Sequence, residues 1–324
     1  MTTKEKVLEA LSETDGYISG QALAVKLGLS RNSVWKAVKQ LQEEGCLIEA
    51  VSNKGYRLTE CADVLSEGLL SSCLSVKKHN IIVLNETDST NNYAKKLAAK
   101  GAEDGTIIIS DTQTAGKGRL GRSFCSPPGI AVYMTEIIRP ETDMQTNQLI
   151  TSCAAVAVSK AVDELCKAET KIKWVNDIYL NEKKICGILT EASLSFESGQ
   201  LDYAVIGIGV NVRSVKEYFD EKLLETATSI EDETGKAPLR CVLAAKIADN
   251  LDLLLGDIEN HSFMEEYRKR SCIIGCRVAV SKYNGGREAL AVGIDDNAGL
   301  MVKYDDGTEE VLNSGEARII KESM

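Results

Sequence analysis

Two short helical segments joined by one glycine most strongly constrain how this chain folds. Residues 19–27 place Leu23 and Leu27 on one helical face. Gly28 suits the left-handed turn that ends this helix, and Ser30 suits the N-cap of a second one. The pattern predicts a helix-turn-helix, a unit so small that the rest of the 324-residue chain must fold separately.

The second helix, residues 31–42, has one apolar and one basic face. Val34, Val38 and Leu41 recur at helical spacing and are expected in the core. Trp35 is assigned to the core or to packing against the backbone, rather than to base recognition. The polar residues of the other face, with the N-cap serine, are the candidate DNA contacts: Ser30, Arg31, Asn32, Ser33, Lys36 and Lys39.

Residues 46–60 contain two β-prone runs around Asn53-Lys54-Gly55, which predicts a hairpin that serves as a wing. Lys54 and Arg57 would reach DNA phosphates from it. The chain has a net charge of −10, yet residues 20–42 hold four bases and no acid. This local basic strip favours DNA binding. The alternative is a helical protein-interaction module with a solvated basic face.

The sequence disfavours two classes of protein, membrane proteins and metal-binding proteins. The longest mostly apolar stretch, Leu149–Ser159, is too short to cross a bilayer, and the N-terminus shows no apolar signal-peptide segment. We therefore expect a cytoplasmic protein with no membrane partner. The ten cysteines form no CxxC pair, and His79 and His261 lie far from any ligand-like spacing. No structural metal and no disulfide is expected.

From about residue 81 strands and helices alternate, which predicts an α+β protein with a mixed, mostly antiparallel central sheet. The expected strands are 81–85, 106–110, 131–138, 172–175, 179–180, 185–192 and 203–212, and the expected helices are 89–100, 147–167, 247–258 and 263–269. From Cys272 onward, short strands around turns at 284–286, 296–299 and 305–307 predict a small barrel. The expected domains are residues 1–62, 63–270 and 271–324.

The run Gly116–Gly121 matches the G-x-G-x-x-G pattern of dinucleotide-binding folds. That fingerprint must open a helix, whereas two prolines and a strand follow here, so the match is rejected. What remains is a glycine-rich loop with Lys117, Arg119 and Arg122, which can bring backbone N–H groups and positive charge to an anion. The alternative is a flexible surface loop with solvated charges.

Two further segments carry candidate site residues. Lys184 precedes a β-prone run and is expected to be partly buried, so it needs an anionic partner and becomes a candidate ligand residue. Gly207 and Gly209 lie inside a predicted strand. They indicate close approach by a ligand or another backbone, although strand packing alone could explain them.

Five motifs in one order carry a family resemblance: TDSTNN (87–92), QTAGKGRLGR (113–122), KWVND (173–177), KICGIL (184–189) and GIGVN (207–211). Over essentially its whole length the chain resembles bacterial bifunctional biotin–protein ligases that also repress the biotin operon. The resemblance implies a winged helix-turn-helix, a class II synthetase-like central domain and an SH3-like C-terminal barrel.

The resemblance also implies a site. Lys184, Arg119 and Asp177 would act in catalysis, with Asp177 orienting the acceptor amine or a metal. The implied biotin contacts are Ser89, Thr90, Asn91, Gln113, Lys117, Gly118, Arg119 and Lys184. The implied nucleotide contacts are Arg122, Phe124, Asn176, Asn211 and Arg318.

Three positions depart from the family pattern. Val175 stands where the family often has proline, which should not alter the chemistry. Lys117 stands where some members have arginine, which keeps the charge but loses the two-pronged hydrogen bonding. Phe124 stands where some relatives have an adenine-stacking tryptophan, so stacking there would be weaker.

The implied activity is the ATP- and Mg²⁺-dependent formation of biotinyl-5'-AMP and transfer of biotin to a lysine of a biotin carboxyl carrier protein. The adenylate would also act as corepressor and favour a homodimer on operator DNA. Two alternatives stay open: a non-catalytic, ligand-sensing repressor, and a ligase for a related acid such as lipoate.

Overall fold

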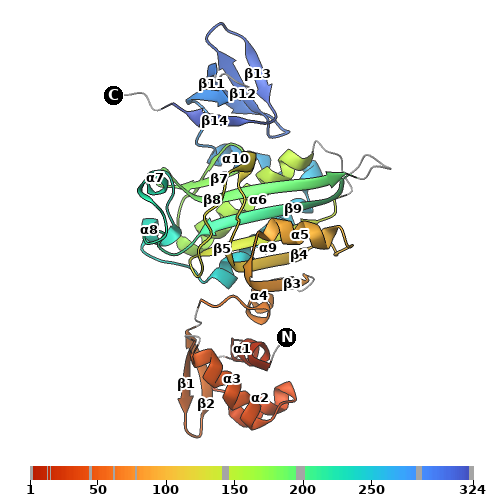
Figure 1. Ribbon diagram of the computed structural model, residues 1–324, viewed down its shortest axis with the longest axis vertical. Helices are drawn as coiled ribbons and strands as arrows, with labels where there is room; N and C mark the ends of the chain where they lie inside the picture. The colour runs from red at the N-terminus through yellow and green to blue at the C-terminus, as the bar shows by residue number, and fades with distance from the viewer. Residues whose placement is uncertain are drawn as a thin grey trace.

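The computed structural model describes residues 3–320 except 13, 15, 44–45, 61–62, 77–78, 141–145, 195–200 and 282–286. Figure 1 shows three parts along the long axis: small helices and a hairpin at one end, a large sheet covered by helices in the middle, and a small sheet at the other end. The predicted boundary after residue 62 adjoins residues outside the described ones.

The N-terminal part contains the predicted helix-turn-helix and hairpin. Its elements are α1 (Thr3–Ser12), α2 (Gly20–Leu27), α3 (Arg31–Glu43), β1 (Leu47–Val51) and β2 (Gly55–Glu60). Gly28 has a φ of 64°, as the turn after α2 requires. The Ser30 hydroxyl accepts a hydrogen bond from the Ser33 N–H at 3.0 Å, so the predicted N-cap of α3 is confirmed.

The core of this part follows the predicted helical spacing. Val34, Val38 and Leu41 are each at most 2% exposed. The assignment of Trp35 to the core is wrong, because this residue is 50% exposed. Trp35 lies one position after Val34, and this 100° step around the helix carries it out of the core and beside the basic residues.

The central sheet has seven strands in the order β3-β4-β5-β9-β8-β7-β6. Only β3 and β4 pair in parallel, which confirms a mixed, mostly antiparallel sheet. The strands are β3 (Ile81–Thr87), β4 (Thr106–Gln113), β5 (Ala131–Ile138), β6 (Lys171–Lys173), β7 (Asp177–Leu180), β8 (Lys183–Leu194) and β9 (Leu201–Asn211). Most expected strands lie at these places, and β8 continues two residues beyond its expected end at 192. The strand expected over 172–175 is correct only to Lys173, because residues 174–176 form the turn between β6 and β7.

Helices cover both faces of this sheet. Ile108 of β4 packs under α5 (Thr90–Ala98), whereas its neighbours Ile107 and Ile109 belong to the core beneath α6 (Thr146–Cys166) and α9 (Arg240–Leu255). The shorter helices are α4 (Glu67–Cys73), α7 (Glu221–Leu224), α8 (Ile230–Thr234), η2 (Ile258–Asn260) and α10 (Met264–Arg270). Among the described residues no helix is both long and apolar enough to span a membrane.

The C-terminal part is an antiparallel sheet of five strands in the order β13-β12-β11-β10-β14. The strands are β10 (Arg277–Ser281), β11 (Arg287–Ile294), β12 (Leu300–Tyr304), β13 (Glu309–Leu312) and β14 (Glu316–Ile319). The expectation of a strand from Cys272 is wrong, because residues 272–276 form turns and β10 begins at Arg277. The turn predicted at 284–286 lies outside the described residues.

Candidate active site

A cavity of about 150 Å³ opens where the central sheet meets the glycine-rich loop and the start of β14. The loop follows β4 and contains only one short 3₁₀ turn, η1 (Arg119–Gly121), before β5. No helix opens after the glycines, which agrees with rejecting the dinucleotide fingerprint. Most predicted site residues line this cavity: Ser89, Thr90, Asn91, Gln113, Lys117, Gly118, Arg119, Arg122, Phe124, Asn176, Asp177 and Lys184.

One wall of the cavity is a buried network of neutral polar groups. The Thr90 N–H donates to Gln113 Oε1 at 2.9 Å, and the Thr135 hydroxyl donates to Asn91 Oδ1 at 2.7 Å. Ser89 is 1% exposed and stands at the N-cap of α5, yet its hydroxyl does not cap the helix. Fixed donors and acceptors of this kind suit an uncharged polar head group.

Glycines in β9 make room for two of these side chains. A Cβ atom on Gly207 would lie 2.1 Å from Asn91 Oδ1, and one on Gly209 would lie 2.6 Å from the Phe124 ring. The predicted close approach therefore exists, but it involves side chains rather than another backbone. Phe124 in turn meets Tyr133 edge to face, with 6.3 Å between ring centroids.

Backbone hydrogen bonds fold the glycine-rich loop back on itself. The Gly118 N–H donates to the Arg122 carbonyl at 2.7 Å, and the Phe124 N–H donates to the Gly116 carbonyl at 2.8 Å. A Cβ atom on Gly116 would lie 2.4 Å from the carbonyl oxygen of Phe124, so only glycine allows the loop to close in this way. Lys117 is exposed and donates to Asn92 Oδ1 at 2.6 Å. The loop is thus a compact cover and not an extended surface strand.

Five cations line the cavity, and three of them, Lys184, Arg119 and Arg122, are each held by a partner that also lines it. Lys184 Nζ lies 2.7 Å from Asp177 Oδ1, and both side chains are partly buried, at 30% and 24% exposure. Arg119 donates to Asn176 Oδ1 at 2.9 Å and to the Gly315 carbonyl at 3.0 Å.

Arg122 donates to both carboxylate oxygens of Glu316, at 2.8 and 2.7 Å. These hydrogen bonds raise the pKa of Arg122 and lower the pKa of Glu316. The loop is therefore tied to the C-terminal sheet. Such a group of cations can neutralise two negatively charged reactants that would otherwise repel each other.

Two predicted nucleotide residues do not line the cavity. Arg318 is exposed on β14, one position beyond the lining residue Ala317. Asn211 is buried at the end of β9, where its Nδ2 donates to the Thr228 carbonyl at 2.9 Å. Its position and hydrogen bond indicate a role in holding the strand end.

The lining residues that were not predicted as site residues include Lys173, Trp174 and Glu316. Trp174 Nε1 donates to the Ala298 carbonyl at 2.8 Å, so this ring joins the central sheet to the C-terminal one. Lys173 and Trp174 belong to a quoted motif and could have been found there. Glu316 carries no motif, and only the fold brings it to Arg122.

The predicted DNA contacts gather on α3 and the hairpin. Arg31, Asn32, Lys36 and Lys39 are exposed on one face of α3. Ser33 is half-buried, and its hydroxyl is 2.8 Å from that of Ser30, so these two serines contact each other.

The two cations of the hairpin, Lys54 and Arg57, differ in their partners within the protein. Lys54 is exposed in the turn, 5.6 Å from the centre of the Tyr17 ring. Arg57 donates to Glu49 Oε2 at 2.9 Å and stacks over the same ring at 4.9 Å. Arg57 is thus partnered within the protein, and Lys54 is the better placed of the two for a phosphate.

Comparisons with known proteins find matches for the N-terminal part and for the central part of the chain. Residues 83–211 match the biotin/lipoate A/B protein ligase family, and residues 3–57 match a helix-turn-helix domain. The chain is 33% identical to the bifunctional ligase/repressor BirA of Bacillus subtilis, over 97% of this chain and 98% of that protein. It is 27% identical to BirA of Escherichia coli, over 92% of each.

Solved structures give the same result for the larger part of the chain. The biotin protein ligase from Aquifex aeolicus in complex with biotin and ATP superposes with a TM-score of 0.64 and 28% identity, covering 75% of this chain and 99% of that one. The chain therefore belongs to the biotin/lipoate A/B protein ligase family, as a bifunctional ligase/repressor of the BirA type.

Proposed function

We propose that the protein activates biotin with ATP, transfers it to a lysine of a biotin carboxyl carrier protein, and represses transcription in response to biotin. The proposed enzymatic activity rests on one observation: Lys184, Arg119 and Arg122 line the same cavity as the neutral polar wall. The wall would hold the uncharged ring system of biotin. The cations would meet its carboxylate and the phosphates of ATP.

In the first step a biotin carboxylate oxygen attacks the α-phosphorus of ATP. A carboxylate–phosphorus bond forms, the bond from the α-phosphorus to the bridging oxygen breaks, and pyrophosphate leaves with that oxygen. Lys184 and Arg119 would act by positioning and charge neutralisation, with no covalent intermediate on the protein. Arg122 and Phe124 would hold the triphosphate and the adenine.

Mg²⁺ would enter with ATP. The carboxylate of Asp177 is an oxygen ligand of the kind that Mg²⁺ takes together with phosphate oxygens and water. When bound, the ion would neutralise phosphate charge. In the second step the lysine amine attacks the biotinyl carbonyl and AMP leaves with its oxygen. We propose that Asp177 orients this amine.

The loop over the cavity would shield the adenylate from water. The five-stranded C-terminal sheet would be the SH3-like domain that helps to place ATP and the carrier. The limits of the three domains would be 1–62, 63–270 and 271–324. A ligase that also binds an operator would work in the cytoplasm.

The exposed basic face of α3 supports the repressor part, because the second helix of a helix-turn-helix enters the major groove. Bound adenylate would favour a homodimer that places two such helices on one operator. By linkage, a ligand that the dimer binds more tightly must also strengthen the dimer.

The direct test is incubation of the protein with biotin, ATP and a carrier domain, followed by mass measurement of the carrier. We expect the mass to rise by one biotinyl group, only when ATP is present. No transfer despite biotin binding would favour the ligand-sensing repressor. Preference for lipoate over biotin in a competition would favour the lipoate-type ligase. Operator DNA, added with and without biotin, then tests repression.

A further inference from the structure

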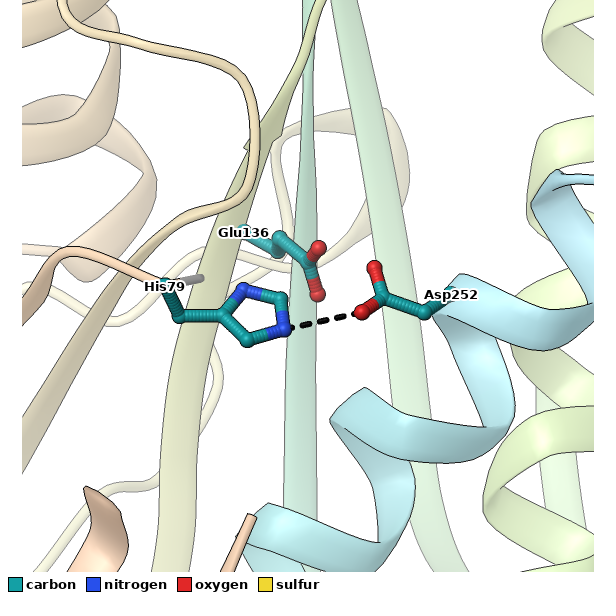
Figure 2. A group of neighbouring side chains, drawn as sticks. All are labelled: His79, Glu136 and Asp252. Carbon is teal, nitrogen blue, oxygen red and sulfur yellow. Dashed lines mark hydrogen bonds and ion pairs between the residues drawn. The ribbon is translucent and has the colours of Figure 1, made fainter. Parts of the chain in front are cut away.

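Three side chains of types that bind metals meet on the face of the central sheet that packs against α6 and α9. His79 precedes β3, Glu136 belongs to β5 and Asp252 belongs to α9. One ligand atom from each lies within 4.8 Å of the other two. Figure 2 shows the three side chains pointing toward one another. None of the three lines the candidate active site.

The sheet explains why a glutamate faces this cluster. Met134, Glu136 and Ile138 alternate along β5 onto the same face, and the two apolar residues belong to the core beneath α6 and α9. Glu136 therefore points into the layer between sheet and helices, where it is 1% exposed. Burying a carboxylate there is costly unless positive charge or hydrogen bonds compensate it.

The imidazole is oriented as metal ligands usually are. Its Nδ1 lies 2.7 Å from the Gly105 carbonyl oxygen, an acceptor only, so Nδ1 carries the hydrogen. Nε2 then faces the carboxylates and lies 2.9 Å from Asp252 Oδ2. A histidine whose other ring nitrogen donates to a backbone carbonyl is the usual form of a metal-ligating histidine.

The spacing also suits one ion. Ligand atoms about 2.1 Å from a metal lie roughly 3–4 Å apart, so small rotations of the carboxylates would bring all three into contact with it. A second cavity, of about 250 Å³, borders Glu136 and Asp252 and gives water access to the remaining coordination positions. When both carboxylates are ionised, the cluster carries net negative charge whether the imidazole is neutral or protonated.

We propose that His79, Glu136 and Asp252 bind a divalent transition-metal ion, with Zn²⁺ as the expected occupant. One imidazole and two carboxylates favour such an ion over Ca²⁺ or Mg²⁺, which take oxygen ligands. The ion would fasten the segment before β3 to α9. That segment already contacts the same helix one turn earlier, because the Ser75 N–H donates to Asp249 Oδ1 at 3.0 Å.

The test uses Co²⁺ as a probe with the full-length protein, stripped of metal by a chelator and free of ATP. Cobalt takes the ligands of zinc, and its absorption separates nitrogen and oxygen ligation from thiolate ligation by cysteines elsewhere. We expect one equivalent to bind with a nitrogen/oxygen spectrum and no thiolate bands, and Zn²⁺ to displace it. Asp252→Asn should weaken binding at least about tenfold.

Asp249→Asn is the matched control, because it makes the same change of charge one helical turn away on α9 and should leave cobalt binding unchanged. Glu136→Gln gives a second ligand variant, and circular dichroism verifies that each variant is folded. The proposal is wrong if no cobalt binds, if thiolate bands dominate, or if Asp252→Asn and Glu136→Gln bind as the wild type does. If the cluster serves only as an internal ion pair, no cobalt will bind.

Discussion

The cations of the cavity differ in how readily they can meet a substrate. Lys184 and Arg122 already contact the carboxylates of Asp177 and Glu316. Within the part of the chain that the structure describes, the hydrogen bonds of Arg119 go to an amide oxygen and a backbone carbonyl, which do not neutralise its charge. Arg119 is therefore ready to receive an anion, whereas the other two must exchange a carboxylate for the substrate.

Lys184→Ala should abolish most adenylation, because it removes the partly buried ammonium that we propose to neutralise both reactants. We expect biotin-dependent pyrophosphate release to fall at least about 100-fold. Lys183→Ala is the matched control, since Lys183 is its neighbour on β8 and its amine instead donates to the Leu224 carbonyl at 2.8 Å. Near-normal pyrophosphate release by Lys184→Ala would remove Lys184 from the site.

Arg119→Gly should release reactive adenylate, because it cuts the hydrogen bonds from the loop to Asn176 and Gly315. Free biotinyl-AMP in the medium is the quantity to measure, during single turnover without a carrier. Arg277→Gly serves as control, because this arginine lies on β10 and contacts Asp305 rather than the cavity. Unchanged leakage in Arg119→Gly would show that the loop does not shield the intermediate.

At the residue scale the sequence predicted what depends on chemistry visible in the chain. Charge and glycine content led to Arg119 and Lys184, and the family motifs led to Gln113. The sequence did not predict where the cavity ends along a strand or which way an individual helical side chain points. On β14 the cavity lining ends at Ala317, one position before Arg318. Trp35 follows Val34 by a 100° step around the helix, which carries it out of the core.

Among elements, the link between the glycine-rich loop and β14 is the one that involves the proposed nucleotide residue Arg122. Arg122 and Glu316 form it, with exposures of 60% and 32%. A pair this exposed contributes only about 0–1 kcal/mol to stability, so substrate can break it cheaply. The link is therefore suited to a switch between loop–sheet contact and loop–phosphate contact.

Glu316→Gln should free Arg122 while keeping the size of the side chain. We expect the KM for ATP to fall about two- to fivefold, in line with the small energy of an exposed pair. Arg122→Ala should instead raise this KM. A rise in both variants would show that the pair positions the C-terminal sheet and that Arg122 does not bind ATP.

Most elements could be predicted from periodicity, because they are long or bounded by clear turn residues. The strand over 131–138 matches its prediction to the residue. The prediction failed at Cys272–Cys276, where apolar β-prone residues form turns that connect α10 to the C-terminal sheet. Local preference cannot decide such a connection, since its residues are held by tertiary contacts such as the Gly275 N–H with the Ala291 carbonyl at 2.8 Å.

At the scale of the molecule, the part that carries α3 and the part that carries the cavity are joined by a segment that leads from Asp63 into α4. Asp63 fixes the start of this connection, because the buried Arg240 binds it through Nε at 3.1 Å and through its backbone N–H at 2.7 Å. The sequence predicted the three parts but not these contacts, which join residues far apart in the chain.

Lys36→Ala should weaken operator binding about equally for all DNA sequences, because an exposed lysine of α3 meets phosphates rather than base edges. The slope of log affinity against log salt should become shallower by about one. Lys100→Ala, an exposed lysine after α5, should leave the slope unchanged. An unchanged slope in Lys36→Ala would place DNA on another face.

A crystal structure with biotin and a non-hydrolysable ATP analogue tests the whole account most directly. It should show the biotin carboxylate and the α-phosphate side by side, within hydrogen-bonding distance of Lys184 Nζ and the Arg119 guanidinium, with the biotin rings against Asn91 and Gln113. Both ligands bound well away from the glycine-rich loop and from Lys184 would contradict it.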